Sequence, residues 1–162
     1  MNDTLFRHLK GVKSLIALLV FAFCAEITIS AQNTLNTKQL SIRNQIQSFL
    51  KNEGFQPIID DDDDIKFKRQ GDTYFVTVSH NDDDPFFVKL SKYYNYNETI
   101  TRTKILLFNS GENDYKMCKV IPSNNYYVVK SEMFLTTASS FTNVFYRIIQ
   151  IMDAVEAEIW KL

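Results

Sequence analysis

Two runs of aspartate carry the densest charge in this sequence. Five consecutive aspartates form Asp60–Asp64, and three more, Asp82–Asp84, precede Pro85. Clustered carboxylates are ligands that Ca²⁺ uses, but neither run continues into an Asp-x-Asp-x-Asp-Gly loop with a distal glutamate. Consecutive side chains of an extended segment also point to opposite sides, so few of them can converge on one ion. We predict two solvated turns and no metal site; a calcium site would require that the two turns meet in space.

A nucleophilic mechanism would depend on very few side chains. Beyond the first thirty residues, His80 is the only histidine and Cys118 the only cysteine. A Cys-His or Ser-His-Asp mechanism would have to include His80, and this pair cannot supply the usual ligands of zinc. We expect His80 at the surface beside an acidic turn, and Cys118 as a small buried residue within a strand. We predict no catalytic residue and no cofactor.

Tyrosines crowd two segments of the chain. Tyr93, Tyr94 and Tyr96 lie together, and Tyr126 begins another strand-like segment beside Tyr127. Exposed tyrosines are effective contact residues, because the ring gives a large area at low entropic cost and the hydroxyl still forms hydrogen bonds. Strand alternation buries some of these rings, and the alternative is that they close the edge of the core. We predict Tyr93, Tyr94, Tyr96 and Tyr126 as partner-binding residues.

The N-terminus has the features of a secretory signal. Arg7, Lys10 and Lys13 form a basic stretch, and the apolar run over residues 15–23 follows it. This run matches the hydrophobic region of a signal peptide and is shorter than the roughly 20 apolar residues that span a membrane. We therefore expect the chain to be exported, to the periplasm or the extracellular space, with no membrane span after cleavage.

Cleavage after Ala31 would divide the chain into a signal peptide, residues 1–31, and a single domain, residues 32–162. The small side chain of Ala31 suits the cut, and the ending Ser-Ala-Gln resembles many signal peptides of Bacteroidetes. Cys24 does not fit a lipoprotein signal, because Phe23 stands where a small residue is needed.

The remaining composition excludes several classes of protein. Without the three bases and two acids of the first 31 residues, 15 basic and 17 acidic side chains remain, a formal charge of −2. A chain with this balance does not recruit nucleic acid through bulk charge. Cys118 alone cannot form an intramolecular disulfide, so the domain must be stabilised by its core.

Two helices are indicated by apolar residues at helical spacing. Asn36 and Gln39 could form a capping pair for a helix that ends at Gly54, with Phe55 folded back onto its last turn. A longer helix begins near Ser139. Its apolar stripe is wide enough to cover a sheet. The two stripes are Ile42, Ile46, Phe49 and Leu50 in the first helix, and Phe141, Phe145, Ile148, Met152, Val155 and Ile159 in the second.

Alternating residues between the helices predict strands. A three-strand meander covers 65–68, 74–79 and 86–96, with turns at 70–72 and 81–85. A hairpin follows, in which residues 117–121 and 127–135 are joined by a turn at Pro122–Asn125. The segment 99–111 fits a buried strand as well as a helix with Ile100, Lys104, Leu107, Phe108 and Gly111 on one face, and periodicity does not decide between them.

The order of these elements resembles the YbjN-like family and, more broadly, the type III secretion chaperone-like fold. The similarity lies in spacing and residue class, at Phe49-Leu50 before Gly54-Phe55, Ile65-Lys66-Phe67, Leu107 to Asn113 before Tyr115-Lys116, and Val128-Val129-Lys130. The resemblance implies that Ile100–Gly111 is a helix. It also implies binding, because secretion chaperones hold extended partner segments and the YbjN-like branch is described as sensory or regulatory. Export distinguishes this chain from the cytoplasmic chaperones.

Together these observations predict an exported α+β domain. An antiparallel sheet, a three-strand meander plus a hairpin, is accompanied by N-terminal, middle and long C-terminal helices. We expect a non-enzymatic binding module for a protein or peptide partner, with homodimer formation left open. One alternative is a small-ligand or calcium-responsive sensory domain, and another is a hydrolase that uses Asp or Glu carboxylates.

The signal peptide generates the first testable prediction. Mass analysis of the protein from its native host should show a chain that begins at Gln32, because basic, apolar and small residues follow one another up to Ala31. An intact N-terminus, or one lipidated at Cys24, would show that the assignment is wrong.

Overall fold

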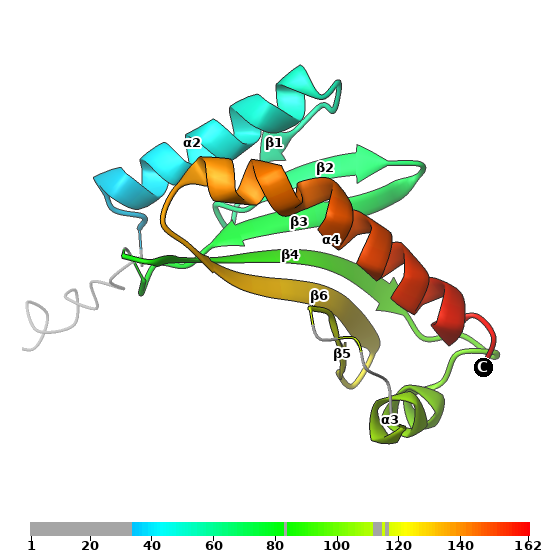
Figure 1. Cartoon of the computed structure of the whole chain (residues 1–162). Coiled ribbons are helices and arrows are strands. Elements are labelled where there is room, and N and C mark those ends of the chain that lie inside the picture. Colours follow the sequence, from blue (N-terminus) through cyan, green and yellow to red (C-terminus); the bar gives the residue numbers. More distant parts are fainter. Residues whose placement is uncertain (1–33, 83, 112–114, 116) are drawn as a thin grey trace, which may run out of the picture. The chain divides into compact units, whose positions relative to one another are not determined.

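The computed structural model describes residues 34–162 apart from 83, 112–114 and 116 (Figure 1). The predicted signal peptide, residues 1–31, lies outside the described residues. The described residues form one antiparallel sheet and three helices. In chain order the elements are α2 (Thr37–Asn52), β1 (Ile58–Ile59), β2 (Ile65–Arg69), β3 (Asp72–Val78), β4 (Phe86–Asn95), α3 (Arg102–Ser110), β5 (Lys119–Pro122), β6 (Tyr126–Leu135) and α4 (Ala138–Ile159).

The six strands are ordered β1-β2-β3-β4-β6-β5, and every neighbouring pair is antiparallel. The meander β2-β3-β4 and the hairpin β5-β6 join where β4 pairs with β6. This pairing runs without interruption from Phe86 opposite Leu135 to Asn95 opposite Tyr126. The predicted α+β class, with its meander, hairpin and three helices, is confirmed.

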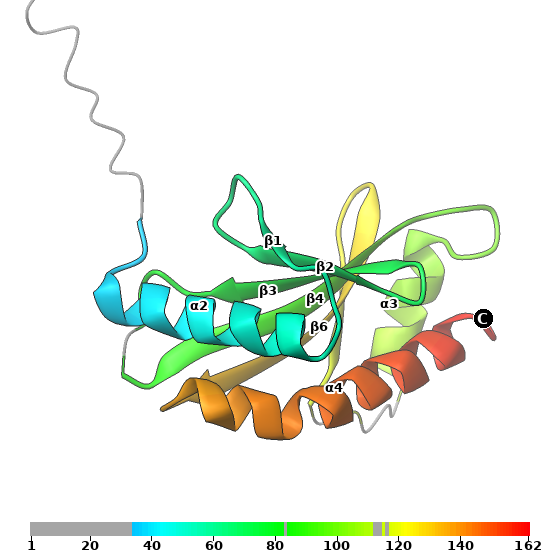
Figure 2. The ribbon, with the colours of Figure 1, turned by 90° about the horizontal axis from the view of Figure 1, so that it is seen from above.

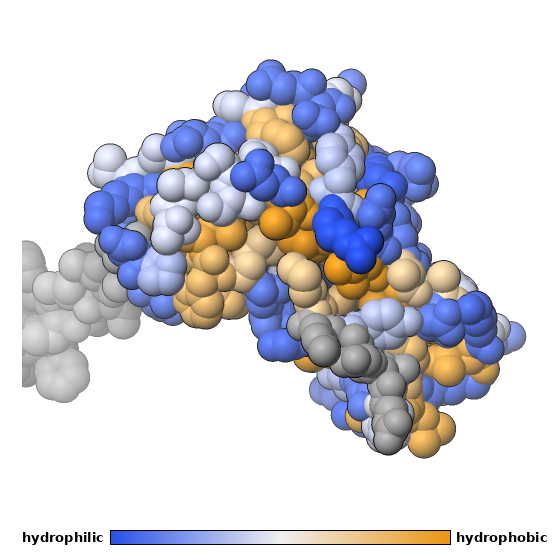
Figure 3. All heavy atoms as spheres, in the orientation of Figure 1, coloured by the Kyte–Doolittle hydropathy of each residue, from blue (hydrophilic) through white to orange (hydrophobic). Residues whose placement is uncertain are grey.

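The helices lie on one face of the sheet, which we call the helix face (Figures 1 and 2). Alternate strand residues such as Tyr74, Val76 and Val78 point into the core on this face, where α4 contributes its whole predicted stripe. On the helix side of the molecule, hydrophilic residues cover most of α2 and hydrophobic residues reach the surface near α4 (Figure 3). All members of the core cluster lie between Leu35 and Ile159, so this segment contains its own core.

The ends of α2 form as the sequence predicts. Asn36 accepts from the backbone N–H of Gln39, while the Gln39 side chain accepts from the backbone N–H of Asn36, which is a complete capping box. At the other end Gly54 has a φ of +88°, and Phe55 N–H donates to Leu50 O. This bond and the one from Gly54 N–H to Lys51 O make a Schellman motif, which turns the Phe55 ring toward the core.

A two-residue turn joins β2 to β3. Gln70 and Gly71 have φ values of +53° and +93°, and the strands pair up to Arg69 opposite Asp72. Positive φ at both central positions is the mark of a type I′ turn, whose twist matches that of the strands it connects. The predicted turn at 70–72 is confirmed.

Three details differ from the sequence prediction. The segment 100–111 does form a helix, α3, but Leu107 is 65% exposed, whereas Ile105 and Phe108 are buried. The short strand β1 was not predicted, because two residues are too few to show an alternating pattern. Cys118 is buried as expected, yet it precedes β5 and is not part of the strand.

The apolar stripe of α4 should contribute strongly to the free energy of unfolding. Phe145→Ala should lower the free energy of unfolding by about 3 to 5 kcal/mol, because Phe145 is fully buried and its ring packs against Phe49, Phe55 and Phe67. Gln150→Ala, at an exposed position of the same helix, should change it by less than about 0.5 kcal/mol. Urea melts would compare the two variants. If Phe145→Ala has the same urea midpoint as wild type, the stripe of α4 does not pack against the sheet.

Candidate functional site

The first acidic run is a hydrogen-bonded turn. Asp60 Oδ1 accepts from the backbone N–H groups of Asp62 and Asp64, at 3.1 and 3.0 Å. Thr77 donates its hydroxyl to Asp64 Oδ2 at 2.8 Å. Burial nevertheless raises the pKa of Asp64, and the neighbouring Asp60 carboxylate adds to the effect. These carboxylates are therefore occupied by the turn and by β3.

The two acidic turns lie at the same end of the sheet, beside the first half of α2. Gln39 Nε2 donates to the carbonyl oxygens of His80 and Asp82, and Arg43, one helical turn further on, pairs with Asp63 at 2.6 Å. Among the described residues, which do not include Asp83, no three carboxylate, His or Cys groups are placed to hold a metal ion.

His80 and Cys118 show no catalytic arrangement. His80 is half-buried rather than at the surface, because α2 packs against its turn, and its Nδ1 has no hydrogen-bond partner among the described residues. Burial raises the pKa of the Cys118 thiol to about 11, so the thiol stays protonated at neutral pH.

The four tyrosines predicted to bind a partner divide between the two faces of the sheet. Tyr94 lies on the helix face, where its ring stacks on Tyr127 with centroids 5.1 Å apart. Tyr96 also packs on Tyr127, and its hydroxyl donates to Ser123 O at 3.1 Å. These two rings close the edge of the core, which is the alternative raised by the sequence. Their binding role stays an untested prediction.

Tyr93 and Tyr126 lie on the opposite face, which we call the open face because the described helices pack on the other side. Their rings are 5.8 Å apart, and Phe75 meets Tyr93 edge-on at 5.3 Å. A second pair, Phe87 and Phe134, lies toward the other end of β4 and β6, at 5.2 Å. Tyr93 is 46% exposed, Tyr126 39% and Phe134 63%. Aromatic rings therefore reach solvent at two places on this face.

Lysines are interspersed with these rings. By strand register, five lysines lie on the open face. Its acidic residues are Glu132 and, at the margin of the face, Asp64. The open face is thus basic, although the chain as a whole is slightly acidic. Glu132 accepts from Lys119 at 2.8 Å and from Lys130, and these bonds lower its pKa. The lysines of the open face are Lys66, Lys68, Lys89, Lys119 and Lys130.

The sequence reasoning missed a buried lysine on the helix face. Lys92 is 1% exposed, and its Nζ donates to Asp72 at 2.8 Å and to Glu156 of α4 at 2.5 Å. The same ammonium lies over the rings of Tyr74 and Tyr94, at 5.0 and 5.1 Å from their centroids. The only sequence signal for the burial of Lys92 is the alternation of β4, which puts Lys92 on the same face as Leu90.

The surroundings of Lys92 keep it charged. Burial alone would lower the pKa of Lys92, but the hydrogen bonds to Asp72 and Glu156 raise it. A catalytic lysine nucleophile needs a lowered pKa, so this arrangement is structural. Beside it, Asp153 accepts from Arg69 at 3.0 Å and from Tyr74 Oη at 3.2 Å, which extends the polar network between the sheet and α4.

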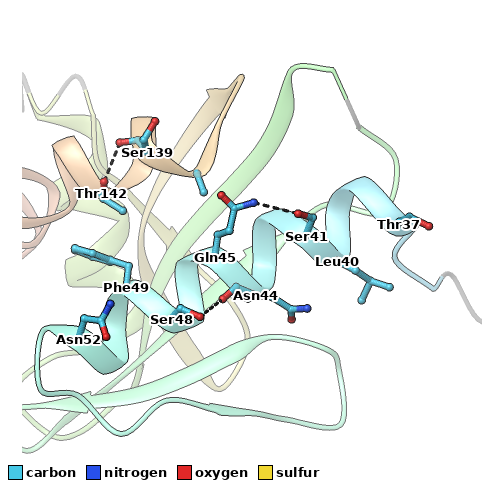
Figure 4. Close-up of a pocket in the computed structure, with 11 residues that line it drawn as sticks. Thr37, Leu40, Ser41, Asn44, Gln45, Ser48, Phe49, Asn52, Ser139 and Thr142 are labelled. Carbon is cyan, nitrogen blue, oxygen red and sulfur yellow. Dashed lines mark hydrogen bonds between the residues drawn. The ribbon is translucent and has the colours of Figure 1, made fainter.

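A hollow of about 770 Å³ lies between α2 and the start of α4 (Figure 4). Phe49 and Leu40 line it together with uncharged Ser, Thr, Asn and Gln side chains. Several of these polar groups bond within their own helix, such as Gln45 to Ser41 and Ser48 to the carbonyl of Asn44. It is a shallow groove and offers no charged group for catalysis.

Comparisons with known proteins show the fold alone. A scan against protein-family models finds no match, and a search of curated proteins finds none. Among solved structures, the chain is similar to an uncharacterized protein from Methanothermobacter thermautotrophicus, with a TM-score of 0.53 and 12% identity. The match covers 74% of this chain and 97% of that one. In the part of the chain that the structure describes, no helix has the length and apolarity to cross a membrane.

The Lys92 arrangement generates a prediction. Lys92→Met should destabilise the domain, toward the lower end of the roughly 3 to 5 kcal/mol typical of a broken buried ion pair, because Asp72 remains partly exposed. Lys66→Met, on the open face of β2, should cost less than about 1 kcal/mol. Urea unfolding at pH 7 compares the two. Equal midpoints would contradict a structural role for Lys92.

The same comparison extends to alkaline pH. The pKa of Lys92 is raised in the folded state, so its stabilisation is complete below its unfolded value of about 10.5 and is lost as the pH rises through the folded value. Burial also raises the pKa of Tyr127, to about 12, which acts in the same direction. Wild type should therefore lose stability above about pH 10, and Lys92→Met should lose less over that range.

Proposed function

We propose that this chain is an exported, non-enzymatic module that binds a protein or peptide partner through the open face of its sheet. The observation that carries the proposal is the pair of aromatic clusters on this face, around Tyr93 and Phe134, with lysines between them. A sheet face that meets only water usually carries polar side chains. Exposed aromatic area of this kind is typical of interaction surfaces.

Two further observations support binding over catalysis. The thiol of Cys118 is buried with a raised pKa, and the ammonium of Lys92 is held by two carboxylates, so neither is a nucleophile at neutral pH. The sequence resemblance to the YbjN-like and type III secretion chaperone-like proteins points to the same class of function, since secretion chaperones hold extended partner segments. The proposed export places the partner in the periplasm or outside the cell.

Photocrosslinking in the native host tests the proposal. The full chain would carry p-benzoylphenylalanine in place of Tyr93, Phe134 or Tyr146 in turn. Tyr146 is the matched control, because it is 47% exposed but lies on α4, on the helix side. Positions 93 and 134 should give a crosslinked product, because both rings lie where a partner would contact the face, and position 146 should not.

Each result has a definite meaning. A product of about twice the mass of the chain from position 93 or 134 would identify the partner as a second copy. Products from position 146 alone, or none from any position, would contradict binding through the open face.

A further inference from the structure

A small hollow lies on the open face over β4, β6 and β5, with Ser91 of β4 in its lining. Its volume is about 140 Å³, well below the roughly 300 to 1,000 Å³ of pockets that enclose a whole small ligand. Ser91 is fully buried, and its Oγ has no hydrogen-bond partner among the described residues. A buried hydroxyl without a partner costs free energy, and such groups are rare in folded proteins. The hollow thus has the size of one side chain and an unused hydrogen-bonding group.

Two lysines flank this hydroxyl. Lys130 lies directly opposite Ser91 on β6, and Lys89 lies two residues before it on β4. Glu132 is the cross-strand neighbour of Lys89, yet it bonds to Lys119 and Lys130 instead. Lys89 therefore has no ion pair or hydrogen bond among the described residues, and its charge acts on the more distant Asp64. The hollow has an excess of positive charge.

The other walls of the hollow are apolar. Tyr93 and Tyr126 stand on one side as a ring pair, and Val128 and Ile121 continue the wall across β6 to β5. An extended segment that covers these residues would bury apolar area on the side of the hydroxyl away from Lys89. A free anion would meet the lysines but would leave the rings exposed. The combination suits a peptide that carries its own negative charge.

We infer that the hollow around Ser91 receives an aspartate or glutamate side chain of a peptide segment that lies across the open face. Because Ser91 is fully buried, the side chains over it would have to move aside first. The carboxylate would then accept from Ser91 Oγ and pair with Lys89, and Lys130 would turn to it from Glu132. Charge-assisted hydrogen bonds of this kind are stronger than neutral ones. This inference rests on the proposed function and specifies the chemistry of its partner.

The test uses residues 32–162, which include every core residue that the structure describes, and a fluorescein-labelled hexaglutamate peptide. Fluorescence anisotropy gives the affinity, and ¹H–¹⁵N spectra locate the contact. Hexaglutamate should shift the amide signals of residues 89–93 and 128–131, and its binding should weaken as salt is added. Hexalysine and inorganic phosphate are the control probes and should shift neither segment.

Four substitutions sharpen the test. Lys89→Met and Ser91→Ala should each weaken binding by about three- to tenfold, because each removes one partner of the carboxylate. Ser131→Ala is the matched control, since Ser131 is equally buried on β6 with an unpartnered Oγ but points to the helix face. It should leave the affinity unchanged. Glu132→Gln should strengthen binding by about threefold, because it removes the competitor for Lys130.

Other outcomes would overturn the inference. If hexaglutamate shifts Lys66, Lys68 and Lys119 as much as Lys89, the attraction is diffuse and the hollow is not a pocket. If phosphate produces the same local shifts, the site takes a free anion and not a side chain. If crosslinks form at position 93 but hexaglutamate fails to bind, the proposed function holds and the acidic-peptide inference fails.

Discussion

The ten-residue pairing of β4 with β6 is the constraint on which the rest of the structure depends. Side chains alternate across a strand, so a shift of one residue in this register would exchange the two faces of the sheet. In the observed register Leu90 and Lys92 face the helices, whereas Ser91 and Tyr93 face away from them. The pairing of β4 with β6 thus sets which residues form the core on one face and which form the proposed binding surface on the other.

Lys92 shows how strict this constraint is. A lysine at a helix-face position has to be buried, and a buried ammonium is costly unless it is paired. The domain meets this requirement with carboxylates from β3 and α4 and with the rings of Tyr74 and Tyr94, whose faces the ammonium contacts. Because Glu156 belongs to α4, the same contact also links that helix to the sheet.

Much of the architecture could be predicted because it depends on short patterns. The capping pair at Asn36, the glycine at position 54 and the stripe through Phe145 are local signals, and alternation placed Val76 and Leu90 inside. The remaining features depend on contacts between distant segments. No local pattern shows that Glu156 would meet Lys92, or that Tyr93 would pack against Phe75 and Tyr126 of neighbouring strands. Likewise Leu107 fits a helical face, but β5 and β6 determine which side of α3 is covered.

The short strand β1 leaves part of the sheet without a neighbour. It pairs only with Ile65 and Lys66, so in the described residues β2 continues unpaired along that side from Phe67 to Arg69. Such an edge can add strands from other molecules and start aggregation. Lys68 places a positive charge at this edge, whereas Arg69 is paired with Asp153, so a second copy approaching edge to edge meets like charge at Lys68. A charge of this kind opposes the addition of a further strand at the edge.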